Sequence, residues 1–225
     1  MKTLKQHINE ALKIGKNLSE WSSYSCQPKT KEELEKIIKA RISKEGPNCD
    51  LNDIDTSLIT DMSGLFEESE FNGDISKWDV SNVKDMSCLF YVSEFNGDIS
   101  KWNVSKVENM ERMFSSSKFN KDISKWNVSK VRTMKDMFIG SEFNGDISRW
   151  DVGNVKDMSF MFCKTKFNGD ISKWNVTSVD NTVYMFYGAR FNQDISNWKI
   201  SKDCDIRYMF RYCPIRKEYK PKLQR

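Results

Sequence analysis

Residues 95–118 read FNGDISKWNVSKVENMERMFSSSK, and this stretch decides the fold because the chain repeats it. Its opening motif, F-N-x-D-I-S-x-W, occurs six times, beginning at Phe71, Phe95, Phe119, Phe143, Phe167 and Phe191. The starts are 24 residues apart without insertion, and a weaker unit, residues 47–70, precedes them in register. A fixed period predicts seven units that each pack on their neighbours, which is typical of a solenoid.

The spacing of apolar residues within one unit predicts a strand followed by a helix. Val107, Met110, Met113 and Phe114 follow the i, i+3, i+6, i+7 pattern of a short helix. The segment before them, residues 98–104, contains Ile, Trp and Val after an N-G turn and predicts a short strand. We therefore expect an α/β solenoid of seven strand-turn-helix repeats, curved because strands stack more closely than helices.

One tryptophan per unit recurs at the same position and is expected to form a structural core ladder. An aromatic ladder of this regularity favours core packing over a ligand site. The ladder consists of Trp78, Trp102, Trp126, Trp150, Trp174 and Trp198.

The ends of the chain differ from the repeats. Residues 30–46 predict an amphipathic capping helix, because Thr30 and Glu33 form a capping box and Gly46-Pro47 stop the helix. Residues 1–29 form a leader with a short apolar stripe and a polar linker, and residues 214–225 form a basic tail. The repeat solenoid itself is assigned to residues 47–213.

The unit F-N-x-D-I-S-x-W-[DN]-V-S-x-V-x-x-M-x-x-M-F resembles the BspA-like family, also called DUF285, over residues 47–213. This resemblance implies a leucine-rich-repeat-like array that binds other proteins, in some members as an adhesin of the cell surface. It implies no enzymatic activity.

Charge is distributed unevenly along the chain. Residues 1–46 hold 10 basic and 6 acidic side chains, residues 47–200 hold 18 and 23, and residues 201–225 hold 8 and 3. An acidic array does not favour nucleic acid as a partner. One basic row nevertheless crosses the array and is the candidate binding face: Lys77, Lys101, Lys125, Arg149 and Lys173.

Two readings of this basic row remain open. Either the neighbouring aspartate row neutralises it, or an acidic ligand does. The aspartate row is Asp74, Asp98, Asp122, Asp146, Asp170 and Asp194. A parallel asparagine row, which begins at Asn72, is expected to satisfy backbone groups.

The sequence predicts neither catalysis nor a cofactor. The only histidine is His7, and the six cysteines form no C-x-x-C pair. An active site needs one special place, whereas a solenoid repeats its chemistry, so we expect no enzyme and no metal site. Without an apolar export segment, the cysteines are expected to be reduced.

Two classes of function remain. The chain is either a monomeric recognition or adhesion module that binds a protein through the array surface, or a structural or accessory component of a bacteriophage virion or mobile element. The second reading rests on residues 1–29, whose opening is similar to leaders of phage structural proteins. No stretch reaches the roughly 18 apolar residues of a membrane span, and no signal peptide is evident, so a cytoplasmic or virion-associated location is expected. Display on the cell surface would require non-classical export.

Overall fold

The computed structural model describes residues 24–222 and corrects the predicted secondary structure. Within this range the helices are α2, Lys31–Glu45, and the short 3-10 helix η2, Lys217–Tyr219. The repeats contain neither the predicted strand nor the predicted helix, and parallel bridges between single residues take the place of a sheet in the described range. The α/β solenoid of strand-turn-helix repeats is therefore wrong.

Each unit is instead a run of tight turns whose ends point inward. In residues 95–118, backbone hydrogen bonds close turns from Ile99 to Trp102 (3.1 Å), from Val104 to Val107 (2.9 Å) and from Met110 to Met113 (3.3 Å). An apolar pair at i and i+3 matches the two ends of a β-turn as well as it matches one face of a helix. The spacing that predicted the helix was produced by these turns.

Polar residues begin several of these turns. The Asp98 carboxylate accepts a hydrogen bond from the N–H of Ser100 at 2.9 Å, and the Asn109 amide oxygen accepts one from Glu111 at 2.9 Å. Side chains of Asp and Asn favour such local bonds over strand or helix ladders. The chain is thereby bent into a closed coil.

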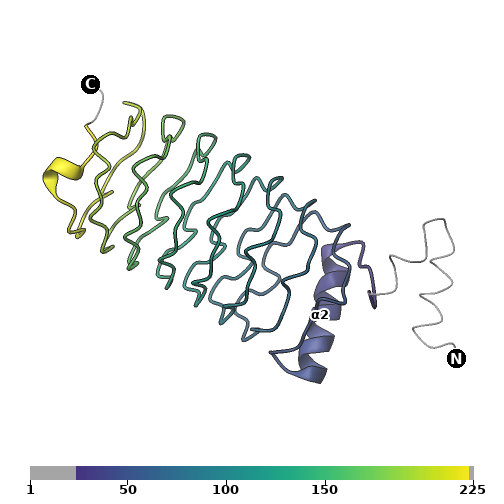
Figure 1. Ribbon diagram of the computed structural model, residues 1–225. Helices are drawn as coiled ribbons and strands as arrows, with labels where there is room; N and C mark the ends of the chain where they lie inside the picture. The colour runs from purple at the N-terminus through teal and green to yellow at the C-terminus, as the bar shows by residue number, and fades with distance from the viewer. Residues whose placement is uncertain (1–23, 223–225) are drawn as a thin grey trace, which may run out of the picture.

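Successive coils stack on one another, so that equivalent positions of neighbouring repeats lie side by side (Figure 1). The N–H groups of Met110, Arg112 and Phe114 donate to the carbonyls of Thr133, Lys135 and Met137, at 3.1, 2.9 and 3.0 Å. The same pattern links each earlier and later pair of coils, with alternate residues donating along the stack and the others closing turns within their own coil.

Columns of identical side chains fill the interior of the stack. Ring centroids in the column that contains Phe90 and Phe114 lie 5.6 to 5.8 Å apart, and those in the column of Phe95 and Phe119 lie 6.1 to 6.5 Å apart. Because no row of helices separates the coils, the reason for expecting a curved array disappears.

The two ends of the stack are covered differently. At the first coil, α2 packs Leu34 and Ile38 into the core, and its Thr30 cap accepts a hydrogen bond from Glu33 N–H at 3.3 Å. At the last coil, part of the basic segment after residue 213 also packs on the stack. Ile215 is buried, and the backbone carbonyl of Tyr219 accepts a hydrogen bond from the Ile195 N–H at 3.0 Å.

Candidate functional site

The tryptophan ladder lies in the interior of the stack. All six indoles are buried, and each Nε1–H donates to a backbone carbonyl of the preceding coil; Trp126, for example, bonds to Ile99 at 3.1 Å. These side chains are out of reach of any partner. Their geometry suits a structural role.

The predicted basic row lies on the surface. Each of its five side chains is exposed. The ion pairs within residues 24–222 include none of these five groups. The neighbouring aspartates are used locally instead, because each accepts a hydrogen bond from the backbone N–H two residues later. This bond lowers the pKa of all six carboxyls.

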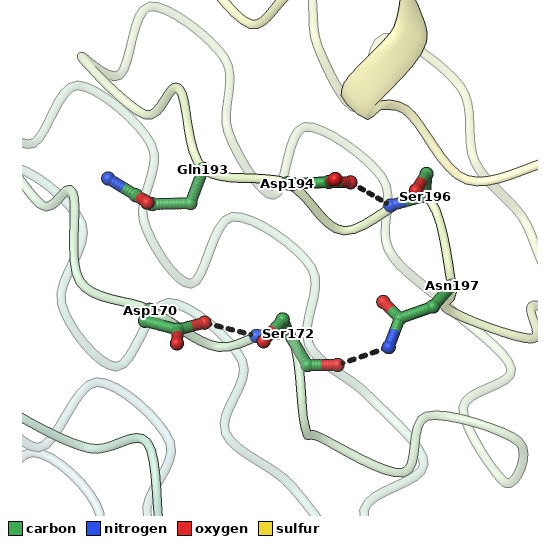
Figure 2. A pocket seen from close by; sticks show the side chains of 6 residues that line it. All are labelled: Asp170, Ser172, Gln193, Asp194, Ser196 and Asn197. Carbon is green, nitrogen blue, oxygen red and sulfur yellow. Dashed lines mark hydrogen bonds between the residues drawn. The ribbon is translucent and has the colours of Figure 1, made fainter.

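A polar hollow of about 330 Å³ lies between the last two of these turns (Figure 2). Asp170 and Asp194 line it, but their carboxylates bond the N–H groups of Ser172 and Ser196, both at 2.9 Å. Asn197 spans the hollow and donates to the Ser172 carbonyl at 2.9 Å. The side chains of Asp170, Asp194 and Asn197 thus bond to the backbone of their own or the neighbouring coil. The asparagine column does the same between coils: Asn120 accepts from the Asn144 N–H at 2.9 Å.

One part of the surface carries side chains that differ from those of the earlier repeats. Phe160, Tyr184 and Tyr208 occupy one position in the last three full coils, and their rings stack with centroids 4.9 and 5.0 Å apart. Tyr187 meets Tyr184 and Tyr212 edge to face, at 5.2 and 5.3 Å. We name these five residues together with Arg211 the aromatic cluster.

The aromatic cluster is open to solvent. Tyr208 is 50% exposed and Tyr212 is 68% exposed. The Arg211 guanidinium lies 5.4 and 5.0 Å from their ring centroids, in cation–π range, and donates a hydrogen bond to the Tyr212 hydroxyl at 3.1 Å. That hydrogen bond raises the pKa of Arg211, so the cluster carries a permanent positive charge.

The same outward positions carry unlike residues in the earlier coils. Arg112 and Asp136 occupy the column of Phe160 and pair at 3.1 Å, while Glu111 and Lys135 pair beside them at 3.4 Å. The aromatic cluster was not predicted from the sequence, because the candidate binding face was chosen from a column that stays constant. Reading outward positions at the 24-residue period would have aligned its three stacked rings.

Side chains that ligate metals are not grouped in the described range. Among residues 24–222, no three His, Cys, Asp or Glu side chains are placed to hold one metal ion. All six cysteines are free, and burial is the main cause that raises the pKa of each thiol. The predicted leader lies mostly outside the described residues. Within residues 24–222 no helix is both long enough and apolar enough to cross a bilayer.

The geometry defines a class of protein: a repeat protein made of stacked 24-residue coils with one non-repeating surface cluster. A family model described as "Mycoplasma protein of unknown function, DUF285" matches residues 33–142 and 117–220. The chain therefore belongs to this family. Neither the curated proteins nor the solved structures contain a significant match.

Proposed function

We propose that the chain is a non-catalytic module that binds another protein, with the aromatic cluster as its principal contact. The observation that carries this proposal is the exposure of Tyr208 and Tyr212, with the Arg211 guanidinium 5.4 and 5.0 Å from their ring centroids. Tyrosine and arginine are enriched among the residues that contribute most to binding between proteins. The repeat unit resembles that of the BspA-like family, in which some members are adhesins, and this resemblance favours the same class of function.

The frame suits this role. Buried columns hold the coils in register, while outward positions change from coil to coil without disturbing the core. A rigid aromatic side chain loses little conformational entropy on binding, so a preformed cluster is an efficient anchor.

A cross-linking pull-down from the native source tests the proposal. The full chain is compared with a Tyr208→Ser, Tyr212→Ser variant and with a matched control, Leu58→Ser, Val92→Ser, which removes apolar side chains that are 48% and 44% exposed elsewhere. We expect the first variant to lose capture of the partner and the control to retain it. Equal capture by both variants would contradict the proposal.

Two further variants address the other predictions. Lys101→Glu with Lys125→Glu reverses charge on the basic row, and a chain without residues 1–29 removes the leader. We expect both to retain capture. If capture is lost only without the leader, recruitment through the N-terminus, as in the virion-component hypothesis, would replace our proposal.

A further inference from the structure

The last coil of the stack presents backbone donors without acceptors. In every earlier coil, four N–H groups in alternation donate to carbonyls of the next coil. The first such set belongs to Met62, Gly64, Phe66 and Glu68. The equivalent groups in the last coil belong to Ile206, Tyr208, Phe210 and Tyr212. Within residues 24–222 these four N–H groups make no hydrogen bond, and by their register they point off the end of the stack.

The segment after residue 213 covers only part of this end. The Arg216 N–H donates to the Asn192 side chain at 3.1 Å, where the asparagine of a next coil would donate, and the Tyr219 carbonyl accepts from the Ile195 N–H. The backbone of this segment makes no hydrogen bond to residues 206–212 in the described range. The part of the last coil that holds the four donors is therefore left open.

A guanidinium lies at this open part. Tyr184, in the preceding coil, stacks on one face of the Tyr208 ring, with centroids 5.0 Å apart. The face that remains for Arg211, whose guanidinium is 5.4 Å from the Tyr208 centroid, is the one toward the end of the stack. Arg211 is thereby brought to the side to which the Tyr208 N–H points.

An ammonium group lies at the same end. Phe186 stacks on one face of the Phe210 ring at 5.7 Å, and Lys220 Nζ lies over this ring at 5.5 Å. The ion pairs within residues 24–222 include neither Lys220 nor Arg211. Two positive charges without an acidic partner thus accompany the open N–H groups.

Only acceptors complement this set of groups. Backbone N–H, guanidinium and ammonium groups all donate, and none accepts. In the earlier coils carbonyl oxygens take this place, but the two cations favour oxygens that carry negative charge. A phosphate group offers three such oxygens and about −1.5 to −2 charges, so it can meet the Arg211 fork and backbone N–H groups together. A carboxylate has two oxygens, and both are used by one guanidinium fork.

We propose that the open end of the last coil binds a tetrahedral oxyanion, a phosphate or sulfate group, through the Arg211 guanidinium and the N–H groups of Tyr208 and Tyr212. Lys220 adds a second positive charge at this end. Because Arg211 and both tyrosines belong to the aromatic cluster, the inference rests on the proposed function and makes it more specific: the partner presents such a group to the end of the stack.

The test is a titration of the full chain, labelled with ¹⁵N, with inorganic phosphate and with sulfate against chloride at constant ionic strength. We expect saturable shifts of the Tyr208 and Tyr212 amide resonances. The amides of Met209 and Arg211 should respond much less, because their N–H groups already donate within the coil. Acetate, the matched control for a carboxylate, should bind at least about tenfold more weakly.

Two variants test the role of the guanidinium. Arg211→Gln should weaken phosphate binding roughly tenfold or more, since hydrogen bonds to a charged group are lost. Arg190→Gln removes an exposed arginine outside the proposed site and should leave binding unchanged. Both sites are exposed, so the rest of the spectrum should show the same fold in both variants.

The source of the oxyanion is distinguished with acetyl-Gly-Gly-phosphoserine-Gly-Gly-amide and its unphosphorylated counterpart. Tighter binding of the phosphopeptide than of inorganic phosphate would support a group carried by a polypeptide, and equal binding would support a site for the free ion. The unphosphorylated peptide should not bind.

Three results would overturn the oxyanion site: no saturable shift with phosphate or sulfate, equal binding of acetate, or unchanged binding by Arg211→Gln. If phosphate does not bind but Tyr208→Ser, Tyr212→Ser still abolishes capture of the partner, the oxyanion site alone is refuted. If phosphate binds and that variant captures the partner as well as the parent does, the proposed function alone is refuted.

Discussion

Each tryptophan of the repeat joins two coils through both halves of its side chain. The Trp126 ring fills the core, and its Nε1–H satisfies the Ile99 carbonyl of the preceding coil at 3.1 Å. Truncation would therefore leave a cavity and also an acceptor without a donor.

Trp126→Ala tests this double role. We expect the free energy of unfolding to fall by about 3–5 kcal/mol, as for other large aromatic residues in cores. Urea unfolding followed by circular dichroism measures the change, with the exposed neighbour Lys125→Ala expected to stay within about 0.5 kcal/mol of the parent. A loss below about 1 kcal/mol would refute the buried ladder.

The turns of the repeat place particular residues at a positive backbone φ. Two positions in each coil adopt positive φ, and they are occupied by Gly64, Gly140 and Gly188 in some coils but by other residues in most. Val92 is the one β-branched residue in this set, with φ of 49°. A β-branched side chain is strained in this left-handed region.

Val92→Gly should raise the free energy of unfolding by about 0.5–1 kcal/mol, because relief of strain exceeds the entropy lost by glycine. Since Val92 is 44% exposed, little packing is lost. Thermal unfolding gives the comparison, with Lys84→Gly, at an exposed site outside the positive-φ set, expected to destabilise. Destabilisation by both variants would contradict the turn geometry.

At the scale of one element, the coil, sequence predicted the period and misjudged the local structure. The 24-residue repeat and the apolar positions are visible in the letters. The choice between helix and turn was not, because Met110 and Met113 satisfy i, i+3 spacing in both. Hydrogen bonds to the next coil, such as Arg112 to Lys135 at 2.9 Å, decide in favour of turns, and they depend on neighbours that one unit does not contain.

The carboxylates that begin these turns give the coils a common dependence on pH. Hydrogen bonds from backbone N–H groups lower the pKa of Asp98, Asp122 and Asp146 below the ordinary 3.8. Their stabilising contribution is therefore present above the ordinary pKa and is lost as the pH falls through the lowered values of the folded chain. Stability should decline below about pH 4.

Replacing Asp98, Asp122 and Asp146 together by Asn keeps an acceptor at each turn but removes the titration. Asparagine already begins equivalent turns at Asn103 and Asn127. Urea unfolding between pH 2 and pH 7 should show a weaker acid dependence for this variant than for the parent. The same slope in both proteins would show that these carboxylates do not act as described.

The capping helix α2 is the second element, and its contribution can be measured separately. Leu34 is fully buried against the first coil. Leu34→Ala should lower the free energy of unfolding by about 2–5 kcal/mol, whereas Lys39→Ala on the exposed side of α2 should change it little. Equal, small effects would show that α2 does not cover the core.

At the scale of the whole molecule, the residues that repeat and the residues of the proposed binding site are different ones. Constant columns build the frame, and the aromatic cluster arises where Phe160, Tyr184 and Tyr208 come into register near one end. The basic row predicted from the sequence is a constant column, whereas the cluster lies at positions that change from coil to coil. The cluster required knowledge of which outward positions the turns bring together.

The central claim is that alternate residues donate hydrogen bonds to the next coil, so that a stacked frame leaves its last donors open. Scalar couplings across hydrogen bonds, measured by NMR on the full chain, identify each donor and acceptor directly. We predict couplings from the amides of Met110, Arg112 and Phe114 to the carbonyls of Thr133, Lys135 and Met137, and none from Tyr208 or Tyr212 in the free chain. Couplings from Phe114 to the carbonyl four residues earlier would instead establish a helix and contradict the stacked-turn fold.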